Sequence, residues 1–199
     1  MKTRLIALAL SLSPALALAE SYQLDGSHSV TSFAVRHMVI STVRGEFTKV
    51  SGSAVIDDAD LSKSSVEASI DVASVSTREQ KRDTHLKSPE FFDAAKFPTI
   101  TFKSTKVEKA GEGALKVSGN LTIKGVTKPV VLDLAGPTKE VTDPWGNVRR
   151  GISASTKINR KDFGVSWSAL VEAGPVVGDE VTIQIDAELV KEKPAPAKK

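Results

Sequence analysis

The chain has 199 residues, of which 40% are hydrophobic and 26% charged, and a formal net charge of +3 at pH 7. This balance is ordinary for one globular domain. The chain contains no cysteine, which excludes a disulfide scaffold, a thiol nucleophile, a zinc–thiolate centre and lipid attachment to an N-terminal cysteine.

Residues 1–19 have the pattern of a secretory signal peptide. Two basic residues precede a short apolar run at 5–12, and Ala17 and Ala19 are the small residues expected before a cleavage site. The apolar run is shorter than the roughly 20 residues that a membrane-spanning helix needs, and no later segment is long enough. Together with the lack of cysteine, this pattern predicts a periplasmic protein of a Gram-negative bacterium whose folded domain covers 20–190.

Residues 191–199 are rich in lysine, proline and alanine, which predicts a disordered tail, with an arm that contacts a wall or membrane as the alternative. Over 20–190 the acidic residues slightly outnumber the basic ones. This part of the chain therefore lacks the basic footprint of a nucleic-acid-binding protein, and we expect no nucleic acid partner.

Short segments of alternating polar and apolar residues, separated by turn signals, predict about eight strands. The expected strands cover 31–38, 45–56, 66–72, 99–107, 114–123, 129–135, 152–158 and 181–189. One apolar face is expected to contain Val66, Ala68, Ile70, Ile183 and Ile185. A sheet with one apolar face must close on itself or pack on another layer, so we expect an all-β, closed antiparallel barrel.

Residues 76–87 interrupt the strand pattern and predict a short, polar helical insertion. Ser76 and Glu79 have the spacing of a capping box, and Ser88 followed by proline predicts the start of a second helical turn. Leu86 is the only apolar residue of the first helix, so we expect this helix to lie on the surface or across an opening of the barrel.

The motifs of common catalytic sites are missing from the sequence. It contains no Gly-x-Ser-x-Gly elbow, no P-loop and no Gly-x-Gly-x-x-Gly turn. His28, His37 and His85 do not have the spacing of a metal site. We therefore expect no catalytic residue, no metal and no cofactor, and hence a protein that is not an enzyme.

The inside of an eight-stranded barrel is just wide enough to be filled by side chains or to hold one small ligand. Several small residues, expected on the inward faces among valines and isoleucines, would leave volume there: Ala34, Ala54, Ala68, Ala154, Ala187, Gly119 and Ser104. Two alternatives follow, a barrel filled by its own side chains or one with an elongated cavity for an apolar ligand.

Motifs along nearly the whole domain resemble those of the YceI-like proteins. They are His28–Phe33, His37–Met38, Gly45–Phe47, Arg82–Leu86, Ser88–Asp93, Phe97–Phe102, Gly119–Pro129, Arg160–Gly164 and Gly178–Val181. Asn120 departs from the pattern, since relatives often carry an acidic residue there. The resemblance implies a lipocalin-like antiparallel barrel with an elongated apolar pore, a periplasmic location, binding of long isoprenoid lipids or fatty-acid derivatives, a role in stress response, and no enzymatic activity.

Three hypotheses follow: a carrier of an isoprenoid or similar amphiphilic lipid, an enzyme acting on such lipids, and a stress-related structural protein with a filled barrel. The first is favoured, and whether the chain forms a homodimer is left open. The residues expected to line the ligand site, with core packing as the alternative for each, are Phe33, Val35, Phe47, Ile100, Phe102, Phe163 and Trp167.

A head-group site is predicted on the polar helix. At helical spacing, Arg78, Arg82 and His85 fall on one face, where they would present cationic groups to a lipid head group at the barrel mouth. The alternatives are a solvated helix and a helix that Arg82 and Asp83 anchor to the barrel.

Overall fold

The computed structural model describes residues 19–171 and 174–193. The expected signal peptide, apart from Ala19, and residues 194–199 of the expected tail lie outside the described residues. The last strand includes Lys191, whose Nζ contacts Glu20 at 2.6 Å. Strand pairing therefore continues to Lys191, and the predicted domain bounds stay a prediction.

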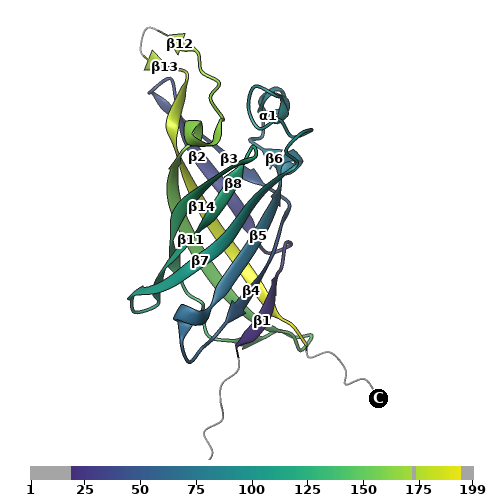
Figure 1. The fold of residues 1–199 in the computed structure, drawn as a ribbon. Helices are drawn as coiled ribbons and strands as arrows, with labels where there is room; N and C mark the ends of the chain where they lie inside the picture. The colour runs from purple at the N-terminus through teal and green to yellow at the C-terminus, as the bar shows by residue number, and fades with distance from the viewer. Residues whose placement is uncertain (1–18, 172–173, 194–199) are drawn as a thin grey trace, which may run out of the picture.

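Nearly all of the regular structure is strand (Figure 1). The strands are β1 (Glu20–Leu24), β2 (Val30–His37), β3 (Ser41–Phe47), β4 (Val50–Ile56), β5 (Ser65–Asp71), β6 (Val75–Ser76), β7 (Thr99–Gly111), β8 (Ala114–Ile123), β9 (Val126–Ala135), β10 (Val141–Thr142), β11 (Val148–Asn159), β12 (Leu170–Val171), β13 (Gly174–Pro175) and β14 (Val177–Lys191). The helices are α1 (Gln80–Lys87) and three 3₁₀ turns, η1 (Leu61–Lys63), η2 (Val72–Ser74) and η3 (Arg160–Phe163). None of the described helices is long and apolar enough to cross a membrane.

The sheet closes into an antiparallel barrel of eight strands, as predicted. The ring runs β11-β9-β8-β7-β5-β4-β1-β14, and pairing of β14 with β11 closes it. β14 pairs with β1 at its carboxyl end and with β2 over most of its remaining length, so β2 continues the course of β1. β3 and β6 continue β4 and β5 in the same way, because β2, β3 and β6 pair with one another in that order.

Apart from the two-residue strands β6, β10, β12 and β13, which were not predicted, two features of the strand pattern differ from the prediction. The expected strand 45–56 is two strands, β3 and β4, separated by Thr48 and Lys49. β1 was not predicted, because its five residues contain one buried side chain, Tyr22, and show no alternation long enough to detect.

The expected inward face is confirmed for the residues named on both strands, β5 and β14. Val66, Ala68 and Ile70 of β5, and Ile183 and Ile185 of β14, all face the barrel interior. Ala34 was placed on the inward face wrongly. Phe33 and Val35 face the interior, and side chains alternate along a strand, so Ala34 points outward.

Helix α1 begins later than expected and has a different cap. Ser76 belongs to β6, and the side chain of Glu79 accepts the hydrogen bond from the Lys81 backbone N–H that caps the helix. The predicted second helical turn at 88 forms a series of turns. Asp83 explains the shift of the helix start, because its carboxylate accepts hydrogen bonds from the N–H and hydroxyl of Thr77 and fixes the chain just before the helix.

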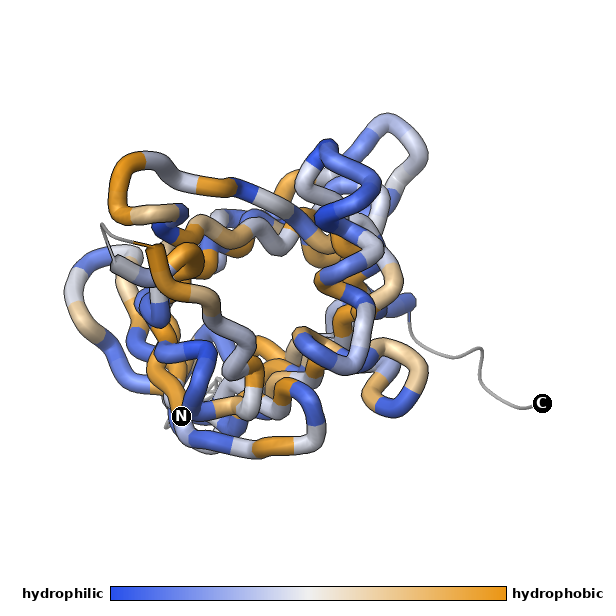
Figure 2. The backbone as a smooth tube through the Cα atoms, turned by 90° about the horizontal axis from the view of Figure 1, so that it is seen from above, coloured by the Kyte–Doolittle hydropathy of each residue, from blue (hydrophilic) through white to orange (hydrophobic). Residues whose placement is uncertain are grey.

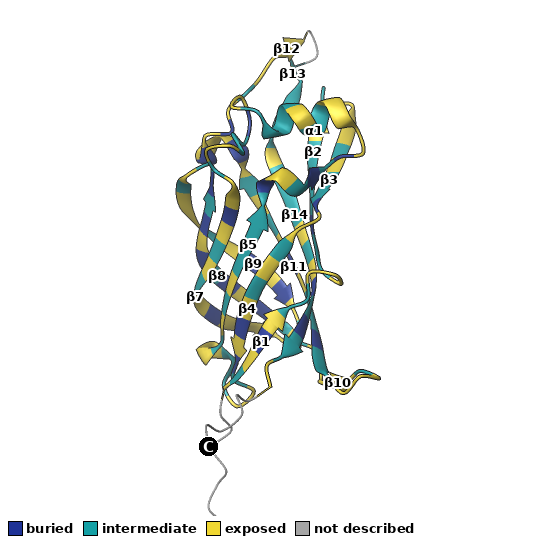
Figure 3. Ribbon diagram, turned by 90° about the vertical axis from the view of Figure 1, so that its right-hand side faces the viewer, coloured by how far each residue is buried: buried dark blue, intermediate teal, exposed yellow. Residues whose placement is uncertain are grey.

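Helix α1 and the β12–β13 hairpin lie at the same end of the barrel, which is visible from two sides (Figures 1 and 3). β1 begins and β14 ends at the opposite end of the barrel (Figure 1). Leu86 packs from α1 against a buried cluster that includes Phe47, Phe91 and Phe163. This contact confirms that a nearly all-polar helix uses its single apolar side chain to attach across a barrel opening.

Candidate ligand cavity

The barrel interior contains an apolar cavity of about 200 Å³, far more than the roughly 10–15 Å³ that one buried water needs. Figure 2, which looks down on the barrel from one end, shows the backbone arranged as a ring. Among the described residues, the lining has only five polar members: Thr31, Ser32, Thr101, Thr156 and Arg160. The rest are aliphatic or aromatic, so the interior suits a hydrocarbon and offers little to a charged group.

Six of the seven predicted lining residues border this cavity, namely Phe33, Val35, Phe47, Ile100, Phe102 and Phe163. Trp167 does not border it. Its indole packs instead against the buried cluster beneath α1, and its ring centroid lies 5.2 Å from that of Phe91. Contact of any of these side chains with a ligand stays a prediction, because side chains of an ordinary hydrophobic core would point into the barrel in the same way.

Two glycines shape the cavity wall, Gly45 and Gly119, of which only Gly119 was predicted to lie on the inward face. A Cβ atom on Gly45 would lie 2.4 Å from Cζ of Phe33, and one on Gly119 would lie 2.4 Å from Cζ of Phe102. Each phenyl ring therefore lies across the neighbouring strand where a side chain is missing. The two rings take their position in the lining from these glycines.

The roof of the cavity comes from two segments that are far apart in the sequence. Leu86, Phe91 and Phe92 reach it from α1 and the following turns. Phe163 and Val165 reach it from η3 and the loop after it. These side chains lie between the cavity and solvent at the α1 end, so this end is covered by side chains of a helix and a loop and not by paired strands.

Arg160, which was not predicted as a site residue, holds the second roof segment in place. Its side chain is buried, and burial lowers the pKa of the guanidinium. All five of its N–H donors have acceptors, which are the backbone carbonyls of Val165, Trp167, Val177 and Gly178 and the carboxylate of Asp179. Arg160 therefore fastens the loop after η3 to β14 and has no donor left for a ligand.

The three residues of the predicted head-group face do not lie together on α1. Arg78 lies before the helix with φ of 63°, so it does not share helical spacing with Arg82 and His85. Arg82 donates to the hydroxyl and the carbonyl of Thr77 at 2.7 and 2.9 Å. His85 pairs with Glu90 through Nε2. The geometry favours the alternative in which Arg82 anchors the helix, and contact of the three side chains with a head group stays a prediction.

The opposite end of the interior is occupied by a polar plug. Tyr22 and Arg150 lie on the inward faces that Leu24 and Ile152 continue into the cavity, and the guanidinium lies 5.6 Å from the centroid of the phenol ring. Arg150 also donates to both carboxylate oxygens of Asp58. Since both plug side chains are buried, we infer that the cavity is closed at this end.

The plug side chains hold one another in their charged or hydrogen-bonded states. The Tyr22 hydroxyl donates to Glu140 at 2.7 Å. Burial raises the pKa of Tyr22, and the hydrogen bond from Tyr22 lowers the pKa of Glu140. The hydrogen bonds from Arg150 lower the pKa of Asp58. These shifts are those of a structural network, in which each ionised group has a partner.

One group of possible metal ligands lies near this end, formed by Asp25, His28 and Glu188, with ligand atoms within 4.8 Å of one another. Arg149 occupies the position that a cation would need, with Nη1 at 2.6 Å from Asp25 and 3.0 Å from Glu188. Its hydrogen bond lowers the pKa of Asp25. We interpret the group as an ion-pair network, because the guanidinium already balances both carboxylates.

Comparison with known proteins gives one consistent result. The YceI-like domain description matches residues 22–189. The UPF0312 protein of Enterobacter sp. (strain 638) is 39% identical, over 97% of this chain and 100% of its own length. The crystal structure of Burkholderia cenocepacia BcnA is similar with a TM-score of 0.72 and 25% identity, covering 83% of this chain and 98% of its own.

A further solved structure is described as a polyisoprenoid binding domain from Saccharophagus degradans implicated in plant cell wall breakdown. It is similar with a TM-score of 0.63, over 89% of this chain and 100% of its own. At 18% identity this likeness shows the shared barrel fold alone. The family match and the curated relatives, together with the barrel described above, establish that the chain belongs to the YceI-like family.

Proposed function

We propose that the protein is a periplasmic carrier that holds the tail of a long apolar lipid, a polyisoprenoid or a fatty-acid derivative, inside its barrel. The observation that carries this proposal is the apolar cavity, which is closed by a polar plug at one end and covered by a helix and a loop at the other. The description of the Saccharophagus degradans domain as polyisoprenoid binding supports the same class of ligand.

The chemistry of the lining indicates how such a ligand would be held. Burial of each CH₂ group contributes roughly 0.8 kcal/mol, so a long tail binds tightly without any polar contact. Arg160 is the only charged residue of the described lining, and its donors are occupied by the protein itself. We therefore expect the head group to remain at the α1 end, outside the cavity.

Two observations weigh against the other functions considered. A barrel filled by its own side chains would not leave about 200 Å³ of apolar space. An enzyme would need a nucleophile together with a base that activates it. The described lining has serine and threonine hydroxyls but contains neither histidine nor carboxylate. The role in stress response implied by the family resemblance is part of the proposal only as the setting in which such a carrier would act.

Native mass spectrometry of protein purified from the periplasm of a Gram-negative host tests this proposal. The expected result is a discrete added mass, released on collisional activation and identified as a polyprenyl or fatty-acyl lipid. Protein that carries no added mass, and that also takes up no fluorescent polyprenyl or fatty-acyl probe after delipidation, would overturn it. Cell fractionation of the same host tests the location, and protein retained in the cytoplasmic fraction would contradict a periplasmic carrier.

A further inference from the structure

Four exposed apolar side chains form a patch at the α1 end of the barrel, which we name the tip patch. Val39 and Ile40 lie in the turn between β2 and β3, and Leu170 and Val171 form β12. Ile40 is 73% exposed and Leu170 is 81% exposed. Isolated exposed apolar residues are common, but large ones that gather on adjacent protruding segments mark an interaction surface.

The two segments of the tip patch are joined by hydrogen bonds and contact. The Met38 N–H donates to the carbonyl of Val176 at 2.9 Å, and the Val176 N–H donates to the carbonyl of Ala169 at 2.9 Å. A Cβ atom on Gly174 would lie 3.4 Å from a methyl of Val39, which is an ordinary packing distance. The β2–β3 turn and the β12–β13 hairpin therefore pack together as one structural unit (Figure 1).

Several backbone polar groups in the described part of the turn and hairpin are paired within the protein. β12 and β13 pair with each other, with Leu170 opposite Pro175. The Ile40 N–H donates to the carbonyl of His37, and the guanidinium of Arg36 donates to the carbonyl of Val39. Unpaired backbone groups are what usually keeps irregular segments out of hydrocarbon. The described segments therefore combine exposed apolar side chains with backbone hydrogen bonds made inside the protein, and both favour burial in lipid.

The tip patch is continuous with the wall of the cavity. β2 runs from Val35, which lines the cavity, to the turn that carries Val39 and Ile40. On the other segment, Val177 lines the cavity two residues after Pro175. The patch therefore lies at the end of the barrel opposite the polar plug of Tyr22 and Arg150.

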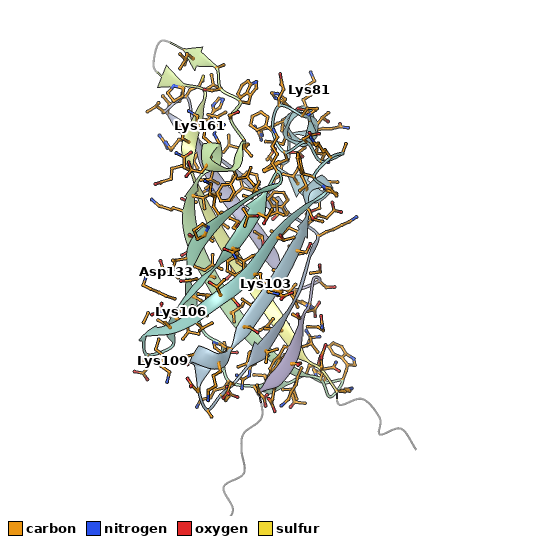
Figure 4. The ribbon with its side chains drawn as sticks, viewed as in Figure 1. Lys81, Lys103, Lys106, Lys109, Asp133 and Lys161 are labelled. Carbon is orange, nitrogen blue, oxygen red and sulfur yellow. The ribbon has the colours of Figure 1, made fainter. Side chains whose placement is uncertain are left out.

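We propose that the tip patch inserts into the surface of a phospholipid bilayer and so places the α1 end of the cavity against the membrane. The observations that carry this step are independent of the cavity's contents, but its use in lipid transfer rests on the proposed function. Basic side chains such as Lys81 and Lys161 lie at the same end (Figure 4), and Lys161 is paired with Asp179. With charges of both signs near the patch, apolar insertion and not attraction to anionic lipid is the main driving force.

Co-sedimentation of the full mature protein with phosphatidylethanolamine–phosphatidylglycerol vesicles tests the proposal. Replacing Ile40 and Leu170 together by serine (I40S/L170S) is expected to lower the partition coefficient by at least about tenfold, since burial of one such side chain is worth about one to two orders of magnitude. The matched control is V141S/W145S, which changes two apolar residues of similar exposure, 64% and 78%, at the opposite end of the barrel. The control is expected to sediment like the wild type.

A second measurement reports directly on whether the tip patch enters the bilayer. Because the chain has no cysteine, single variants I40C and W145C can each be labelled with an environment-sensitive fluorophore. Vesicles should shift the emission to the blue for the label at position 40 and leave that at position 145 unchanged, and the shift should persist at high salt. Circular dichroism and melting temperature check that every variant is folded.

Three outcomes would overturn the proposal. Equal loss of sedimentation in I40S/L170S and V141S/W145S would show that the tip patch is not the site of contact. Loss of binding at high salt would show electrostatic attachment. Conversion of a dimer to a monomer in I40S/L170S, with no vesicle binding by the wild type, would assign the patch to a second copy of the chain. Lipid retained in I40S/L170S by native mass spectrometry would leave the carrier function standing even then.

Discussion

The indole of Trp167 meets the imidazole of His85 edge to face, with ring centroids 5.2 Å apart. This contact joins the loop after η3 to helix α1 over the end of the cavity that is not plugged. Phe91 lies against the same indole, at 5.2 Å between centroids. A lipid tail that enters from this end must pass between the two segments, so the aromatic contact is the barrier that we expect to control ligand exchange.

Replacing Trp167 by alanine (W167A) is expected to speed the release of a bound fluorescent fatty-acyl probe by about tenfold. An aromatic pair is worth about 0.5–1.5 kcal/mol beyond its buried area, and a barrier lowered by 1.4 kcal/mol raises a rate tenfold. Stopped-flow displacement by unlabelled fatty acid measures the rate. The control W145A removes the other, exposed indole and should leave release unchanged; the same release rate in W167A and wild type would contradict a barrier at this contact.

Filling the cavity from its wall should abolish probe uptake without unfolding the barrel. Ala154 is buried on β11 and lines the cavity, so A154F would place a phenyl ring in the space that the tail is proposed to occupy. We expect uptake of the fatty-acyl probe to fall by more than about tenfold while the melting temperature holds or rises, because each methylene of the tail that loses its place forfeits roughly 0.8 kcal/mol. Fluorescence titration and thermal unfolding measure the two effects.

The opposite result for A154F has a definite meaning. In a barrel already filled by its own side chains, the extra ring would overpack the core and lower stability by about 1–3 kcal/mol. A large fall in melting temperature with unchanged probe uptake would therefore contradict an interior site.

The barrel could be predicted from strand periodicity, because the alternation of apolar and polar residues is visible within each short segment of sequence. The alternation of Ile183 and Ile185 with polar neighbours requires one apolar face, and a closed sheet is one of few ways to bury it. The division of residues 45–56 into β3 and β4 could not be seen in this way. It depends on how β2 and β1 share the edge of β14, which is a long-range property of the closed ring.

The candidate site was predictable in its apolar part and not in its polar part. Phe33 and Phe102 have the character of lining residues in any inward-facing strand. The position of Arg82 depends instead on where α1 begins, and the Thr77–Asp83 contact moves that start past Arg78. The role of Arg160 depends on carbonyls that only the folded loop brings together. Such contacts leave no periodic signal in the sequence.

Gly45 should tolerate no side chain while Phe33 is present. A methyl group in G45A would meet the Phe33 ring at 2.4 Å and a methyl of Thr77 at 2.8 Å, so we expect the free energy of unfolding to fall by about 1–3 kcal/mol. Shortening the ring should relieve the clash, so the double variant F33L/G45A should lose less than the two single variants combined. Urea unfolding of the four proteins measures this coupling.

The control for this cycle is G151A, because a Cβ atom there would lie 3.5 Å from the nearest atom, in ordinary contact, and the residue does not need a positive φ. We expect it to be close to neutral. Additive effects of F33L and G45A would contradict the inference that the glycine positions the ring over the strand.

The stability of the barrel should depend on pH through Arg149. Its hydrogen bonds lower the pKa of both Asp25 and Asp143 in the folded protein. A carboxyl group whose pKa is lower in the folded than in the unfolded state contributes stability that is present above its unfolded pKa, about 4, and is lost as the pH falls toward the folded value. We therefore expect the melting temperature to be nearly constant near neutral pH and to fall steeply below about pH 4.

In the R149Q variant both carboxyl groups should return toward their ordinary pKa. The melting temperature should then be lower at neutral pH and fall less steeply in acid, with Asp58 still paired to Arg150. The control K103Q removes a cation from an exposed pair with Glu67, where little stabilisation is expected, and should keep the wild-type profile. An acid profile of R149Q as steep as that of the wild type would contradict this assignment.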